Sequence, residues 1–147
     1  MTRALAGVDL AGRINEAHPD TAIEWNDICV WIEPESLKDV ARFLKDSPEL
    51  EFASLTAVSA VDYIEYFELV YHLLSMRRNR SAVLKTRYYG REEPSVDSVT
   101  DIWIGADLQE REIWDLMGIR FEGHPNMKRI LLWENFPGHP LRKDFLR

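Results

Sequence analysis

Two runs of alternating apolar and polar residues flank a short basic loop near the middle of the chain. The runs are Phe67–Leu74 and Ala82–Tyr88, and residues 77–80 form the loop between them. A period of two is typical of a β-strand that buries one face. The pattern therefore predicts a β-hairpin. It places Lys85 and Arg87 together on one face of the sheet.

Weaker local signals predict the elements around this hairpin. Apolar spacing and capping residues indicate helices at Leu5–Ala17, at Leu37–Lys45 after a Ser36 cap, and from an Asp107 cap to a stop at Gly118. Apolar runs indicate strands at Ile28–Ile32 and Phe52–Val61, while Glu92–Asp97 is expected to be a loop and Ser98–Asp101 to open a turn or short helix. These elements predict an α+β fold, a mixed β-sheet with helices packed on it.

The chain beyond Gly118 shows no regular periodicity. Three prolines, Pro125, Pro137 and Pro140, fall in the last 28 residues, which favours extended and irregular backbone. The segment still contains large apolar side chains, so it must pack on this domain or on another protein. We expect one domain overall, with an α/β part over residues 1–119 and an extended C-terminal docking tail over residues 120–147.

Charge is unevenly distributed along this acidic chain. Its net charge is −7, yet residues 77–91 hold six basic and no acidic side chains. A basic stripe can bind phosphate, but no nucleic-acid-binding motif accompanies it, so we expect no nucleic-acid partner. Contact with an acidic partner protein is the favoured interpretation.

The sequence contains no recognisable binding motif for a redox cofactor and no membrane anchor. It has one cysteine, Cys29, and it lacks Gly-rich nucleotide loops, C-x-x-C pairs and the G-x-S-x-G motif. No apolar stretch reaches the length that a bilayer requires, and Asp9 stands where a signal peptide would be apolar. We expect a reducing, cytoplasmic location.

Charged residues cluster on the helix predicted before Gly118. Arg111 and Asp115 are four residues apart, and Glu110 and Glu112 flank Arg111. One interpretation is a solvated surface ion pair, worth less than about 1 kcal/mol. A second makes the three acids general acids and bases. The third interpretation, which we favour, is a buried network in which Arg111 binds backbone carbonyls or carboxylates. In this network Arg111 fixes the point at which the C-terminal tail leaves the helix.

Two histidines, His124 and His139, each stand in a Gly-His-Pro step. A catalytic zinc site usually has three protein ligands in a short spacing such as H-E-x-x-H, which is missing here, so we expect no metal. The rival hypothesis is a stand-alone acid/base or metal-assisted hydrolase built on Glu110, Glu112, Asp115, His124 and His139. It requires a concave pocket in which these side chains converge.

The ordered run from residue 110 to residue 145 resembles the signature of the 30 kDa subunit family of NADH-quinone oxidoreductase, or respiratory complex I. The family pattern reads ERE-x-x-D-[LMF]-[LMF]-G-I-x-F-x-G-H-P-x-x-x-R-I-L and ends in G-H-P-L-R-K-D-[YF]. The matching residues are Glu110, Arg111, Glu112, Asp115, Gly118, Phe121, Gly123, His124, Pro125, Arg129, His139, Pro140, Leu141, Arg142, Lys143 and Asp144.

This resemblance implies a peripheral-arm scaffold subunit of a proton-translocating NADH (or related donor):quinone oxidoreductase. The signature residues would form structure and interface, and the chain would hold no catalytic, cofactor-binding or metal-binding residue. FMN, iron–sulfur clusters and quinone would belong to partner subunits. The partners would be the hydrogenase-like large subunit and the small terminal-cluster subunit of the complex, on the cytoplasmic side of the membrane. A homologous place in a group 4 hydrogenase, or in a complex fed by F420H2 or ferredoxin, stays open.

Overall fold

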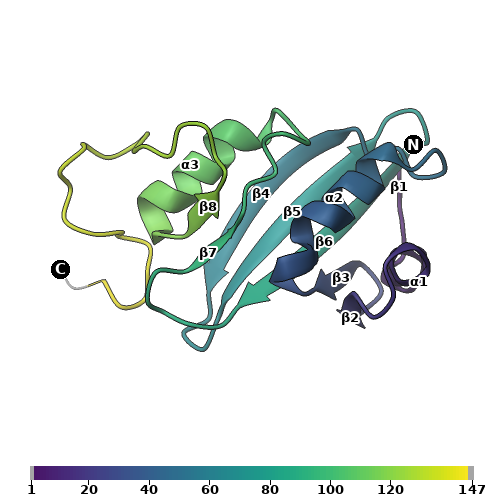
Figure 1. The fold of residues 1–147 in the computed structure, drawn as a ribbon, viewed down its shortest axis with the longest axis horizontal. Helices are drawn as coiled ribbons and strands as arrows, with labels where there is room; N and C mark the ends of the chain where they lie inside the picture. The colour runs from purple at the N-terminus through teal and green to yellow at the C-terminus, as the bar shows by residue number, and fades with distance from the viewer. Residues whose placement is uncertain (1, 146–147) are drawn as a thin grey trace.

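A six-stranded mixed sheet is the framework of the computed structural model, which describes residues 2–145 (Figure 1). The strand order is β2-β3-β6-β5-β4, and β1 pairs with one end of β6. The β1–β6 and β3–β6 pairs are parallel and the others antiparallel, so the predicted α+β fold with a mixed sheet is confirmed. The strands are β1 (Arg3–Ala4), β2 (Ala22–Trp25), β3 (Cys29–Ile32), β4 (Ser54–Asp62), β5 (Phe67–Ser75) and β6 (Arg80–Tyr88).

The predicted hairpin forms the centre of this sheet. Strands β5 and β6 pair from Phe67 opposite Tyr88 to Ser75 opposite Arg80. Asn79 closes the turn with a φ of 55°, a left-handed conformation that asparagine tolerates better than most residues. The inward positions of both strands are buried, as the alternation predicts.

Helices α1 (Gly7–Ala17) and α2 (Leu37–Asp46) pack on the sheet and share its apolar core. Figure 1 shows α2 lying across one face of the sheet. Helix α2 buries Leu37, Val40, Ala41 and Leu44, the spacing of one helical stripe. Ser36 occupies the cap position of α2, as predicted, but it also ends the short 3₁₀ helix η1 (Pro34–Ser36) and its side chain bonds no helix N–H.

The hairpin strand β6 carries the two cations that the alternation groups on one face. Glu68 is buried between them, and its carboxylate lies 3.4 Å from Arg87 Nε and 3.7 Å from Lys85 Nζ. Trp31 Nε1 donates to the same carboxylate at 2.7 Å, and Arg87 also pairs with Glu24 at 3.2 Å. These two cations are therefore neutralised within the chain, which corrects the view of the whole basic run as a surface for a partner.

The third helix, α3 (Ala106–Met117), lies alongside the edge strand β4 (Figure 1). Gln109 on α3 accepts the backbone N–H of Val58 on β4 at 2.7 Å. Gly118 ends the helix in a left-handed conformation, with a φ of 75°, as predicted. The predicted Asp107 cap is wrong, since Gly105 occupies the cap position and no side chain bonds the first turn.

Two three-residue strands were not predicted. Strand β7 (Ser95–Asp97) lies in the expected loop, and it pairs in parallel with β8 (Arg120–Glu122), which lies inside the expected tail. Such short strands carry too few residues to show a period of two. Beyond β8, residues 123–145 form turns and irregular backbone. Within residues 2–145, no helix is long and apolar enough to cross a bilayer.

Candidate functional site

Asp115 on the last turn of α3 holds the start of the tail. Its side chain is fully buried, and Oδ1 accepts a hydrogen bond from Arg129 Nη1 at 2.9 Å. Oδ2 accepts three consecutive backbone N–H groups, those of Ile130 (3.1 Å), Leu131 (2.7 Å) and Leu132 (2.9 Å). Burial opposes the charge, but these donors outweigh it and hold the pKa of Asp115 below its ordinary value.

Two arginines bind the backbone carbonyls of the same segment. Arg129 donates to the Asp115 carbonyl at 2.8 Å and to the carbonyls of Phe136 and Gly138 at 2.9 Å each. Arg111 donates to the carbonyls of Lys128 (3.2 Å) and Arg129 (3.0 Å). Arg111 therefore binds backbone carbonyls, as the favoured interpretation expects, but it is only partly buried. Its spacing to Asp115 suggests an ion pair, but Asp115 turns to Arg129 instead.

A second buried aspartate, Asp62 at the end of β4, holds the far end of the tail. Arg91 binds its two carboxylate oxygens at 2.8 and 2.7 Å, and the backbone N–H groups of Ile64 and Lys143 each donate to it at 2.8 Å. The Arg91 guanidinium keeps the pKa of Asp62 well below its usual range. Arg91 also pairs with Asp144 at 3.1 Å, so both partners fix the tail end.

Sequence reasoning missed this second anchor. Arg91 and Lys143 lie 29 and 81 residues from Asp62, and no local periodicity connects such distant positions. Arg142, a signature residue, joins the cluster by donating to the Arg91 carbonyl at 2.7 Å and to Asp144 at 2.9 Å.

Glu110 is fully buried beneath the turn that precedes α3. Ser98 Oγ donates to Oε1 at 2.6 Å and the backbone N–H of Val99 donates to Oε2 at 2.9 Å. Burial raises the pKa of Glu110 to about 6 despite these two donors. The carboxylate of Glu110 thus links residues 98–99 to α3. The Ser98 hydroxyl donates to this carboxylate instead of capping a helix.

The two histidines have separate structural partners. His124 Nδ1 accepts the N–H of Asn126 at 2.9 Å, so its Nε2 carries the proton and donates to the Asp107 carbonyl at 3.0 Å. His139 Nδ1 donates to the Asp115 carbonyl at 2.9 Å, and its ring packs on Trp114 with centroids 4.9 Å apart. Burial lowers the pKa of His139.

The five side chains of the hydrolase hypothesis do not meet in one pocket. Glu112 is exposed and lines a small cavity of about 180 Å³ between α3 and β4, which none of the other four lines. Within residues 2–145, no group of three or more His, Cys, Asp or Glu side chains could hold a metal ion.

The remaining signature residues have structural positions. Phe121 is buried in β8, and Gly123 has a φ of 86°. Pro125 and Pro140 follow the two histidines, and the Leu141 N–H donates to the Leu116 carbonyl at 2.9 Å.

The anchored tail presents a set of apolar side chains to solvent, which we call the tail surface. Leu131, Trp133 and Leu141 are 61%, 65% and 59% exposed. Asp115 holds the backbone at Leu131 and the Leu116 carbonyl holds it at Leu141, so the backbone on both sides of Trp133 is tied to α3 while these side chains stay exposed. Large apolar groups held outward on a fixed backbone are typical of a protein interface.

Comparison with known proteins identifies the family. The family described as respiratory-chain NADH dehydrogenase, 30 Kd subunit, matches residues 30–147. The corresponding NADH-quinone oxidoreductase subunit of Roseiflexus sp. (strain RS-1) is 44% identical over 96% of this chain and 84% of its own length. The corresponding subunit of Mesorhizobium japonicum is 41% identical over 95% of this chain and 68% of its own length.

Two solved structures share the fold. A chain of the membrane-bound sulfane sulfur reductase, an archaeal respiratory membrane complex, superposes with a TM-score of 0.76 and 27% identity, covering 94% of this chain and 84% of that one. A trypsin-resistant fragment of Nqo5 gives a TM-score of 0.53 and 30% identity, covering 66% of this chain and 80% of the fragment. The chain therefore belongs to the 30 kDa subunit family of respiratory-chain NADH dehydrogenase.

Proposed function

We propose that this chain is the peripheral-arm scaffold subunit of a proton-translocating NADH (or related donor):quinone oxidoreductase. Its relatives are named as subunits of NADH-quinone oxidoreductase, and one structural neighbour belongs to a respiratory membrane complex. The proposed role is to hold the electron-transfer subunits in a fixed arrangement. Electron tunnelling falls steeply with distance, so a subunit that fixes its neighbours affects the rate without reacting itself.

The observation that carries this proposal is the anchored tail. The carboxylates of Asp115 and Asp62 accept hydrogen bonds from backbone N–H groups at the two ends of the tail. Between and beside these anchors, the side chains of Leu131, Trp133 and Leu141 are exposed to solvent. Ordering this much irregular chain costs conformational entropy. Because the backbone of the tail is already ordered, binding a partner through these side chains does not carry a further ordering cost.

We propose that the tail surface docks on the hydrogenase-like large subunit, with the small terminal-cluster subunit beside it. FMN, iron–sulfur clusters and quinone would be held by partner chains, and this chain would have no catalytic residue. The single cysteine, Cys29, is buried in β3, which supports this assignment. The assembly would place the chain on the cytoplasmic side of the membrane, peripheral to the bilayer.

Affinity purification from native membranes tests the proposal. The tagged chain should bring down the hydrogenase-like large subunit and the small iron–sulfur subunit in equal amounts, identified by mass. The purified chain alone should show no turnover and bind no redox cofactor. Stoichiometric cofactor binding or turnover by the isolated chain would overturn the scaffold role.

A second candidate is the equivalent place in a complex with another electron donor, such as a group 4 hydrogenase or a complex fed by F420H2 or ferredoxin. The superposition on the sulfane sulfur reductase chain, which covers more of this chain than the Nqo5 fragment does, favours considering it. The donor would be chosen by other subunits, so the remaining proteins in the same purification decide between the two. NADH-oxidising, FMN-binding subunits would support the first candidate, and their replacement by hydrogenase or ferredoxin-linked subunits would support the second.

A further inference from the structure

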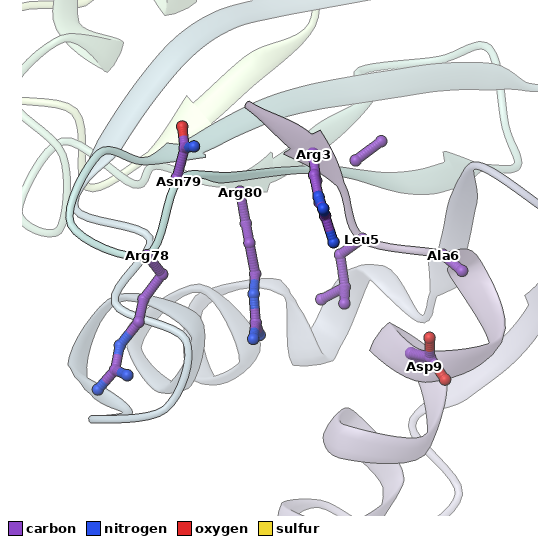
Figure 2. Close-up of a pocket in the computed structure, with 8 residues that line it drawn as sticks. Arg3, Leu5, Ala6, Asp9, Arg78, Asn79 and Arg80 are labelled. Carbon is purple, nitrogen blue, oxygen red and sulfur yellow. The ribbon is translucent and has the colours of Figure 1, made fainter. Parts of the chain in front are cut away.

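A basic cavity lies at the turn of the central hairpin, at the opposite end of the sheet from the tail (Figure 1). Its volume is about 780 Å³, and its walls come from the first residues of the chain, from the start of α1 and from the β5–β6 turn. The lining includes three arginines, Arg3, Arg78 and Arg80, and one carboxylate, Asp9. Figure 2 shows Arg3 and Arg80 extending side by side into the same space, with Asp9 on the wall formed by α1.

The fold forces two of these cations together. Strand β1 pairs in parallel with β6, and Arg3 is the direct register partner of Arg80. The backbone bonds from Arg3 N to the Asn79 carbonyl (3.0 Å) and from Leu5 N to the Ser81 carbonyl (2.7 Å) fix that register. Like charges in register on neighbouring strands repel each other. Within the described chain, neither guanidinium has an ion pair or a side-chain hydrogen bond.

The third arginine is only partly engaged. Arg78 donates to the Pro48 carbonyl and lies 3.8 Å from the Glu51 carboxylate, a contact too long for a hydrogen bond. Elsewhere in the basic run the cations are matched, since Lys85 and Arg87 share Glu68 and Arg91 binds Asp62. Of the six cations, Lys85, Arg87 and Arg91 are therefore matched within the chain, Arg78 and Arg80 line the cavity, and Arg77 lies outside it, 3.6 Å from Glu51.

We propose that this cavity binds an acidic segment of a partner protein, with Arg3 and Arg80 as its principal contacts. Guanidinium groups bind carboxylates through two parallel hydrogen bonds, and an incoming carboxylate would relieve the Arg3–Arg80 repulsion. The cavity is several times larger than one phosphate group, so a chain segment fits it better than a small inorganic anion. That the segment belongs to another subunit of the same assembly rests on the proposed function; the acidic chemistry of the ligand does not.

Arginine-selective labelling with phenylglyoxal, followed by mass spectrometry of the peptides, reads occupancy directly. In the isolated full chain, a hexaglutamate peptide should slow the labelling of Arg3 and Arg80 severalfold, whereas inorganic phosphate at the same ionic strength should not. In the assembled complex both arginines should be protected to a similar degree. Arg77 is the internal control, because it lies in the same turn, is highly exposed and does not line the cavity.

Charge-reversal variants complete the test. Arg3→Glu should weaken hexaglutamate binding by roughly tenfold, the effect of losing one charge-assisted contact, while Arg77→Glu should change it far less. Arg3 is exposed on the two-residue strand β1, so this change leaves the central hairpin intact. Equal labelling in the free and assembled chain, or equal protection by phosphate and hexaglutamate, would overturn the proposal. Neither result bears on whether the tail docks, so the scaffold role is tested separately.

Discussion

One carboxylate, that of Asp115, both pairs with the guanidinium of Arg129 at 2.9 Å and closes over the three backbone N–H groups that follow Arg129 in the chain. Successive N–H groups pointing to one side form a concave anion site. Here the anion comes from the chain itself, from the helix that ends just before the tail. The direction in which the tail leaves α3 is therefore set by a side chain on α3.

Replacing Asp115 by asparagine should release the start of the tail. The amide would place an N–H group among donors, leaving either Arg129 or the backbone N–H groups of residues 130–132 without an acceptor. We expect a loss of about 3 kcal/mol in the free energy of unfolding and faster proteolysis after residue 128. Urea denaturation and limited proteolysis measure these effects. Glu112→Gln, an exposed change on the same helix, should stay within about 0.5 kcal/mol of the wild type. An Asp115→Asn variant as stable and protected as the wild type would contradict the anchor.

Arg111→Ala should loosen the same segment less severely. It removes donors from the carbonyls of Lys128 and Arg129, which are near solvent and can bond water instead. We expect a cost of about 1 kcal/mol and a lower yield of assembled complex. Glu112→Gln should lower the yield less. If Glu112→Gln gave fully assembled but inactive complex, a catalytic role for the α3 acids would replace the structural one.

Glu110 should make stability fall as the pH rises through the weakly acidic range. Burial raises the pKa of Glu110 from 4.5 to about 6, so the folded chain holds its proton more tightly than the unfolded chain. The contribution is fully present below pH 4.5 and is lost as the pH rises through 6, by about 2 kcal/mol. Carboxylates with lowered pKa values, such as Asp62, act in the opposite direction at lower pH.

The variant Glu110→Gln isolates this effect, because glutamine can keep both the Ser98 and the Val99 hydrogen bonds. The difference in unfolding free energy between the wild type and the variant should change steadily between pH 4.5 and 6 and be flat outside that range. A difference that stays constant across the range would show that the pKa of Glu110 is not raised.

Gly118→Ala should disturb the docking of His139. An added Cβ would lie 2.7 Å from the His139 ring, and the φ of 75° disfavours alanine independently. We expect a loss of about 1–2 kcal/mol from the backbone alone and a further loss from the clash. In a His139→Ala background the clash is absent, so Gly118→Ala should cost less there. Equal costs in both backgrounds, measured in a double-mutant cycle, would mean that the two residues are not coupled.

The parts of the fold that could be predicted are those specified by neighbouring residues. The β5–β6 hairpin follows from alternation over two nine-residue strands, and the end of α3 follows from Gly118. Strands β7 and β8 could not be predicted, since each has three residues and the pairing joins segments far apart in the chain. The Asp107 cap was wrong, and Ser36 stands at the cap position without bonding the helix, because serine and aspartate at a helix start only permit a cap.

The candidate site was predictable in its residues but not in its contacts. The signature singles out Asp115, Arg111 and Arg129, yet nothing in their spacing shows that Asp115 pairs with Arg129 and not with Arg111. The Asp62–Arg91 anchor has no local signal, because its partners meet only after β4 and the tail are in place. The interpretation of residues 77–91 as one basic surface was wrong for Lys85 and Arg87, since buried Glu68 on the neighbouring strand pairs with both.

The central claim is that the tail surface binds the partner subunits, and the most direct measurement is purification of tagged variants from native membranes with quantification of each co-purifying subunit. Trp133→Asp changes a side chain that is 65% exposed on the tail, and Trp25→Asp is the matched control on the edge strand β2, 46% exposed. The account predicts that Trp25→Asp brings down the large and small subunits in wild-type amounts, whereas Trp133→Asp is recovered folded but largely alone. Full recovery of both partners with Trp133→Asp would contradict it.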